Sequence, residues 1–134
     1  MTALRDNIRP GINERELGNC IERAYVGEGG GTLIHYISAT SMHASEIGVP
    51  RQYPSPRKVQ NGDVVVSEIT AMFFDYGGQV LRSFSVGEEP TPLYRKLHDV
   101  ANAAFKAITG VLKDGTTPAQ VIEASRVIED SGFT

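Results

Sequence analysis

The sequence predicts an α+β fold in which an antiparallel β-hairpin and one further strand pack against α-helices. Residues 64–74 and 79–86 are long runs rich in strand-forming side chains, and the DYGG segment at 75–78 separates them as a turn. Residues 32–39 (TLIHYISA) form an earlier run of the same kind. Between these strands, residues 40–56 hold several Pro, Ser and Gly residues and are expected to form a long loop, of the kind that often carries function.

Three segments begin with residues that stabilise the first turn of a helix. Asn13 is followed three residues later by Glu16, which is the spacing of a capping box. Thr91 and Thr117 each precede a proline, which fits the first helical position because its missing N–H is not needed there. Apolar residues then recur at helical spacing, most extensively over 93–111. The sequence therefore predicts three capped helices around the strands.

Length and charge narrow the class of protein. A chain of 134 residues corresponds to one domain. The net charge is −3 and basic residues form no stripe, so we expect no nucleic-acid partner. The apolar runs are too short to cross a membrane and the first residues lack the apolar core of a signal peptide, so we expect no membrane partner and a cytoplasmic location.

Several segments together resemble the "pita-bread" family, which includes methionine aminopeptidase, aminopeptidase P, prolidase and creatinase. The segments are 57–65 (RKVQNGDVV), the following Glu68-Ile69, 82–87 (RSFSVG), 9–17 (RPGINEREL) and 112–116 (LKDGT). The resemblance covers nearly the whole chain and keeps the family's order and spacing. The fold of this family consists of two related halves, and residues 11–17 of this chain echo residues 115–121. The resemblance implies that residues 1–134 are a single partial pita-bread domain: the first half plus the leading helices of the second.

The resemblance also implies where a metal site would lie. In the family's peptidases, two aspartates eleven positions apart on the hairpin bind a pair of divalent metals, and a His and two Glu from the later half complete the site. The matching positions here are Glu68 and Gln79. Glu68 keeps a carboxylate, whereas Gln79 offers only a neutral carbonyl oxygen and cannot bridge two cations. The remaining ligands are expected beyond Thr134. We therefore expect no tightly bound metal or other cofactor, and an ordinary polar pair across the hairpin is the alternative for Glu68 and Gln79.

Two further side chains are site candidates. Creatinase, a member of this family, has also lost the metal aspartates. The resemblance to it implies a metal-free hydrolysis in which a loop histidine transfers protons. His43 is the histidine of the corresponding loop, although Arg51, Gln52 and Tyr53 stand nearer to the expected position. A solvated loop histidine is the alternative for His43. Arg82 matches an arginine of the family, and it is expected to pair with Glu68 or to bind a substrate carboxylate.

Three functions remain open from the sequence. The first is a fragment of a pita-bread hydrolase that acts on a C–N bond in a small amide or peptide, independent of metal and inactive as this chain. The second is a non-catalytic binding or assembly domain that retains the fold, and the third is a small stand-alone α+β domain. Because one hairpin and one strand make a small sheet with exposed edges, we also expect the chain to self-associate.

Overall fold

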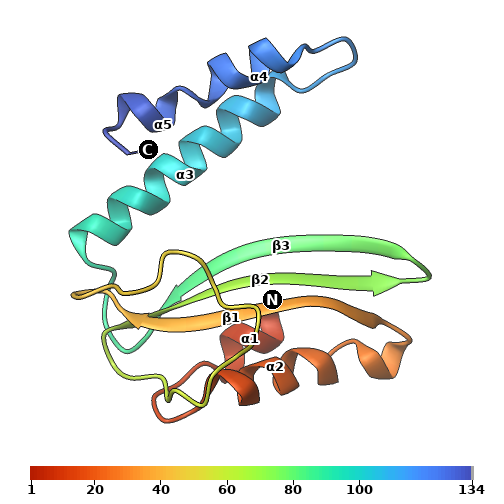
Figure 1. Cartoon of the computed structure of the whole chain (residues 1–134), viewed down its shortest axis with the longest axis vertical. Helices are drawn as coiled ribbons and strands as arrows, with labels where there is room; N and C mark the ends of the chain where they lie inside the picture. The colour runs from red at the N-terminus through yellow and green to blue at the C-terminus, as the bar shows by residue number, and fades with distance from the viewer. Residues whose placement is uncertain (134) are drawn as a thin grey trace. The chain divides into compact units, whose positions relative to one another are not determined.

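The computed structural model describes residues 1–133, and the chain folds as two compact units, Met1–Glu89 and Pro90–Thr134. The first unit has the element order α1 (Thr2–Asn7), α2 (Glu14–Arg23), a short 3₁₀ helix η1 (Val26–Glu28), β1 (Gly31–Ser41), β2 (Asp63–Phe73) and β3 (Tyr76–Ser85). The second unit has α3 (Pro92–Val111), α4 (Pro118–Ser125) and α5 (Val127–Asp130). Figure 1 shows these elements along the chain. The predicted α+β class is confirmed.

The helix starts form as the sequence predicts. At α2, the Asn13 side chain accepts a hydrogen bond from the Glu16 backbone N–H, and the Glu16 carboxylate accepts one from the Asn13 backbone N–H, both at 2.9 Å. Thr91 caps α3, and Thr117 caps α4 together with Gln120. These short-range bonds satisfy backbone donors that a helix start leaves free, which explains why they can be predicted from the sequence alone.

The predicted last helix is interrupted. The helix that Thr117 caps, α4, ends at Ser125, and a separate short helix, α5, begins at Val127. The Ser125 hydroxyl donates to the Ile122 carbonyl at 2.7 Å. A serine that bonds locally to the backbone competes with the regular helical pattern, which fits a break at this point.

The sheet has the strand order β1-β2-β3, and both neighbouring pairs are antiparallel. The turn between β2 and β3 consists of Phe74 and Asp75 alone, because Phe73 and Tyr76 are already paired. Both turn residues have positive φ, 45° and 63°, as in the two-residue turns whose twist suits a hairpin. The sequence prediction of a turn over residues 75–78 is therefore wrong, since Gly77 and Gly78 lie within β3.

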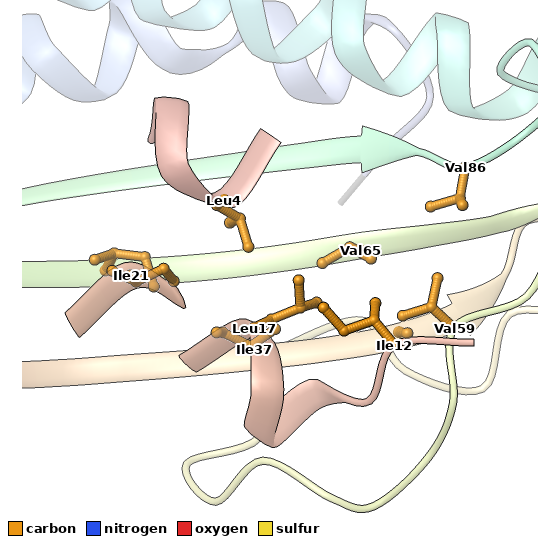
Figure 2. Packing of buried hydrophobic residues seen from close by; sticks show 10 residues of the cluster. Leu4, Ile12, Leu17, Ile21, Ile37, Val59, Val65 and Val86 are labelled. Carbon is orange, nitrogen blue, oxygen red and sulfur yellow. The ribbon is translucent and has the colours of Figure 1, made fainter. Parts of the chain in front are cut away.

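The core of the first unit lies between the helices and one face of the sheet. Ile37 and Ala39 of β1 and Val65 and Ile69 of β2 are buried on this helix-covered face. Figure 2 shows Leu17 and Ile21 of α2 and Leu4 of α1 packed with them, and Ile12, Val59 and Val86 extending the cluster. Because strand side chains alternate between faces, this packing commits the intervening residues to the opposite face.

None of the helices over residues 1–133 is both long enough and apolar enough to span a membrane.

Candidate functional site

The two residues that the resemblance assigns to the family's metal positions, Glu68 and Gln79, lie on the sheet face opposite α1 and α2. In the register of the sheet, Glu68 is opposite Tyr36 of β1 and Leu81 of β3, and Thr70 is opposite Gln79. We call the face that carries Tyr36, Glu68, Thr70 and Gln79 the site face. The register places Glu68 and Gln79 on neighbouring strands as a diagonal pair, close enough for long side chains to interact.

Glu68 and Gln79 are joined by a direct hydrogen bond. The Gln79 amide Nε2 donates to Glu68 Oε1 and to Thr70 Oγ1, both at 3.0 Å. Glu68 is half-buried and Thr70 is buried, whereas Gln79 is exposed. Gln79 thus orients the carboxylate of Glu68 and leaves its second oxygen, Oε2, for another donor.

This arrangement does not fit a dinuclear metal site. Two cations would need several anionic oxygens, and the pair supplies one carboxylate and an N–H donor that already occupies one of its oxygens. Within residues 1–133 no group of three His, Cys, Asp or Glu side chains could hold a metal ion. The donor set of these residues suits a cationic or N–H-bearing group better than a metal pair.

His43 lies away from this pair. Its Nε2 is 3.3 Å from Glu88 Oε2, and its side chain is 64% exposed. His43 follows Ser41, the last residue of β1, whereas Glu68 is opposite Tyr36. Five residues of strand separate those two β1 positions, or about 17 Å. The structure does not bring His43 to the Glu68–Gln79 pair, and its role as a proton carrier there has no geometric support.

Arg82 projects from the other face of the sheet. Its register partner is Ser67, which lies next to Glu68 on β2 and therefore points the opposite way. The Arg82 Nη1 donates to the Leu81 carbonyl at 2.7 Å, and no ion pair joins Arg82 to Glu68 in the described part of the chain. The expected pair between Arg82 and Glu68 is wrong for this reason, while its expected binding of a substrate carboxylate stays a prediction.

Glu14 is a functional candidate that the sequence reasoning missed. Its side chain is fully buried, with Oε1 accepting from the Ala39 N–H at 2.8 Å and Oε2 from the Ser55 N–H at 2.7 Å. It therefore ties the first turn of α2 to β1 and to the loop after it. The signal was available: Glu14 stands three residues before Leu17 and seven before Ile21, so a charge lies on the buried helix face.

A second buried carboxylate lies at the end of the same loop. Asp63, at the start of β2, is 2% exposed and accepts from Nη1 and Nη2 of Arg57 at 2.6 and 2.9 Å. Asp63 also accepts from the Gln60 N–H at 2.8 Å. The hydrogen bonds to Asp63 raise the pKa of Arg57 above its ordinary value. These contacts hold Arg57 and Gln60 against the start of β2.

His35 belongs to a small cluster at the other end of β1. Its Nε2 is 2.7 Å from the Tyr25 hydroxyl, and its Nδ1 is 3.6 Å from Glu22 Oε1. The side chain is 8% exposed, and Nδ1 has no hydrogen-bond partner. Burial lowers the pKa of His35 below its ordinary value of 6.5, although the Glu22 carboxylate opposes the shift. These contacts indicate a structural role for His35.

The lowered pKa of His35 predicts that the fold weakens in mild acid. The unfolded chain takes up a proton near pH 6.5, whereas folded His35 takes it up only at lower pH. Stability contributed by neutral His35 is therefore lost as the pH falls from 6.5 through the folded pKa. Urea unfolding between about pH 7 and about pH 5 should show a smaller decline for His35→Gln than for the wild type. An unchanged slope for His35→Gln would contradict the prediction.

The profile of metallopeptidase family M24 matches residues 1–134, the whole chain. The chain belongs to metallopeptidase family M24. Among curated relatives, this M24 chain is 27% identical to a methionine aminopeptidase of Staphylococcus epidermidis over 125 residues, and 24% identical to an Xaa-Pro dipeptidase of Pyrococcus furiosus over 129 residues.

Solved structures show the same fold. The M24 chain superposes on a prolidase from Pyrococcus furiosus with a TM-score of 0.82 and 22% identity, covering 98% of this chain and 38% of that one. It superposes on the dipeptidase PepE from Mycobacterium ulcerans with a TM-score of 0.80 and 26% identity, covering 98% and 34%. The predicted pita-bread fold is therefore confirmed.

The match covers only part of each relative. The aligned region is 90% of this chain and 49% of the methionine aminopeptidase, and 96% of this chain and 36% of the Xaa-Pro dipeptidase. The M24 chain thus spans about half the length of the methionine aminopeptidase and about a third of the length of the Xaa-Pro dipeptidase.

Proposed function

We propose that the protein to which this chain belongs hydrolyses a C–N bond in a small amide or peptide, without a metal at positions 68 and 79. Family membership supports the reaction class, since the relatives include an aminopeptidase and a dipeptidase. The observation that carries the metal-free form is the hydrogen bond from Gln79 Nε2 to Glu68 Oε1. A donor directed at the remaining carboxylate suits a site that binds a polar organic group.

The chain by itself is proposed to be inactive. Glu68 is the one carboxylate on the site face that lies at a metal position, and His43 is too far away to exchange protons with a group bound there. Without a second acid or base near Glu68, the rate of hydrolysis would be lower by about 100-fold or more, because no positioned group would donate a proton to the leaving group. Further catalytic groups would have to come from outside residues 1–133.

The test uses the protein expressed from its complete gene, with Ala-Pro and creatine as probes. After dialysis against a chelator, we expect hydrolysis of at least one probe to persist. Glu68→Ala should lower kcat/KM about 100-fold, whereas Glu123→Ala, an exposed carboxylate of α4, should leave it unchanged. Activity that vanishes on chelation and returns with added Mn²⁺ or Co²⁺ would overturn the metal-free proposal.

The non-catalytic alternative rests on the same observation. Gln79 has no charge and no acid–base chemistry, so the Glu68–Gln79 pair can bind a ligand without reacting with it. Binding of a probe without any hydrolysis by the complete protein would favour this alternative. Self-association of the sheet or helix surfaces remains a proposal, and sedimentation of this chain as a monomer at micromolar concentration would count against it.

A further inference from the structure

A pocket of about 380 Å³ lies beside α2 and β1, where β1 forms one edge of the sheet. Figure 1 shows α2 running along β1. The lining includes Gly18 and Glu22 of α2 and His35 of β1. Neither Glu68 nor Gln79 contributes to the lining, so this pocket is separate from the pair on the site face. We call it the α2 pocket.

Gly18 leaves an open space in the wall of the α2 pocket. It lies in the middle of α2, where glycine is destabilising relative to alanine because it loses more backbone freedom. Gly18 is buried, yet a Cβ atom at this position would meet no heavy atom within 4 Å outside its own stretch of helix. Its backbone is helical, so neither close packing nor an unusual φ requires a glycine here. The space beside Gly18 can therefore hold a side chain that belongs to a ligand.

The backbone of His35 offers a donor and an acceptor at the free edge of β1. The Met42 N–H bonds to Gly62 on the β2 side, whereas the Ala39 N–H bonds to Glu14. Because backbone groups alternate in direction along an antiparallel strand, Ala39 and His35, which lie in unbroken register, both direct their N–H and C=O away from β2. Among residues 1–133 no group outside the sheet bonds to this N–H or C=O of His35.

A single ligand residue fits this edge. Ile37, the next residue with the same direction, is fully buried, and a register irregularity between Thr32 and Ile34 ends the regular edge on the other side. An extended peptide can therefore pair with β1 at His35 alone, donating one N–H to its C=O and accepting one bond from its N–H. Side chains of residues paired in this way point to the same face. The side chain of the ligand residue would thus lie on the α2 side of the sheet, toward Gly18.

Two proton acceptors face each other on the same side of β1. His35 Nδ1 is 3.6 Å from Glu22 Oε1 and has no hydrogen-bond partner. The Thr32 hydroxyl donates to Glu22 at 3.5 Å, so its oxygen accepts from the Tyr25 hydroxyl, which in turn accepts from His35 Nε2. This order places the imidazole proton on Nε2 and leaves Nδ1 as an acceptor. An ammonium group, which has several protons on one nitrogen, can donate to both acceptors.

Glu22 has a negative charge available for such a group. Its side chain is 47% exposed, and in the described part of the chain no Lys or Arg forms an ion pair with it. Because Nδ1 of His35 has no contact with solvent, this half-exposed carboxylate has to turn outward to admit a donor. Arg15, which also lines the pocket, donates to the Pro54 carbonyl at 3.3 Å and lies about 10 Å from Glu22 along α2. Gly18 and Glu22 lie about 6 Å apart along the helix, a distance that the four-carbon stem of lysine covers.

We propose that the α2 pocket binds an extended peptide segment at a lysine residue. The lysine backbone pairs with His35, its stem lies beside Gly18, and its ammonium group donates to Glu22 and to Nδ1 of His35. Lysine fits better than arginine, because two acceptors 3.6 Å apart suit one compact nitrogen rather than a planar fork. This site is distinct from the Glu68–Gln79 pair, and it does not depend on the proposed hydrolysis.

The test compares two blocked amino acids, N-acetyl-lysine N-methylamide and N-acetyl-norleucine N-methylamide, with the protein expressed from its complete gene. The two probes share their amides and a four-carbon stem, and they differ in the ammonium group. In an NMR titration, the wild type should bind the lysine form about tenfold more tightly. Glu22→Gln should reduce this preference to about onefold, whereas Glu123→Gln, at an exposed carboxylate of α4, should leave it unchanged.

Gly18→Leu tests the space in the pocket. Leucine forms helices better than glycine and its side chain would occupy the open space, so binding of both probes should fall about tenfold or more while urea unfolding shows no loss of stability. Gly18→Ala fills far less of the space and should retain most of the binding. Equal affinity of the wild type for the two probes, no binding of either, or unchanged binding by Gly18→Leu would overturn the proposal.

The amides whose NMR signals shift locate the bound probe. The shifts should be largest at His35 and Gly18, and those of Thr70 and Gln79 on the site face should stay small. Shifts centred on Thr70 and Gln79 would place the probe at the Glu68–Gln79 pair and would overturn this inference, whatever the outcome of the hydrolysis assay.

Discussion

Replacing Asp63 by alanine is expected to lower the free energy of unfolding of the Met1–Glu89 unit by about 3 kcal/mol. The carboxylate is almost fully buried and accepts three hydrogen bonds, two from Arg57 and one from the Gln60 N–H. Its removal leaves the guanidinium without its partner and a backbone donor without an acceptor. Because about a third of the Arg57 side chain is exposed and can be rehydrated, we place the loss at the lower end for buried pairs.

Urea denaturation at neutral pH would measure this loss. Asp63→Asn keeps the shape and one carbonyl acceptor, so it should cost less than alanine. Asp6→Ala removes the exposed pair with Arg5 in α1 and should change stability by at most about 0.5 kcal/mol. If Asp63→Ala and Asp6→Ala had similar effects, the Arg57–Asp63 pair would not be holding the turn before β2.

Replacing Glu14 by alanine is expected to cost about 3 kcal/mol as well, for a different reason. The substitution leaves the buried N–H of Ala39 and the partly buried N–H of Ser55 without an acceptor, at about 1–3 kcal/mol each, and it leaves a cavity next to Leu17. The energetic cost of burying the Glu14 carboxylate disappears at the same time, which limits the total.

Hydrogen exchange would locate this effect. Glu14→Ala should speed exchange of the Ala39 and Ser55 amides more than that of amides in the β2–β3 hairpin. Glu16→Ala is the matched control, since Glu16 is an exposed carboxylate two residues away whose capping bond is worth about 1 kcal/mol. Uniform acceleration across the unit, with no excess at Ala39 and Ser55, would show that Glu14 has no particular hold on the loop.

The site depends on a register that the sequence pattern did not give correctly. A turn over residues 75–78 would pair Gln79 with Phe74 and place Glu68 opposite Ser85, too far apart to touch. The observed turn at Phe74 and Asp75 places Gln79 opposite Thr70, so that Gln79 reaches Glu68. Gly77 and Gly78 favour a turn in the sequence, but Asp75 also adopts positive φ without a glycine. Which of the two registers forms depends on which residues are buried in the core.

By itself the sequence determined the features that depend on neighbours along the chain. The caps at Asn13, Thr91 and Thr117 and the approximate strand positions follow from short spacings, because capping bonds and alternation act over a few residues. The resemblance to the pita-bread family also came from such segments.

Only the tertiary structure decided which distant groups meet. Arg82 and Glu68 lie on opposite faces of the sheet, because their register positions differ by one residue. His43 lies beyond the end of β1. Glu14 accepts hydrogen bonds from Ala39 of β1 and from Ser55 of the following loop. The two contacts of Glu14 join residues 25 and 41 positions apart, and they form because burial leaves the Glu14 carboxylate and these backbone amides each other as partners. No local spacing encodes that choice.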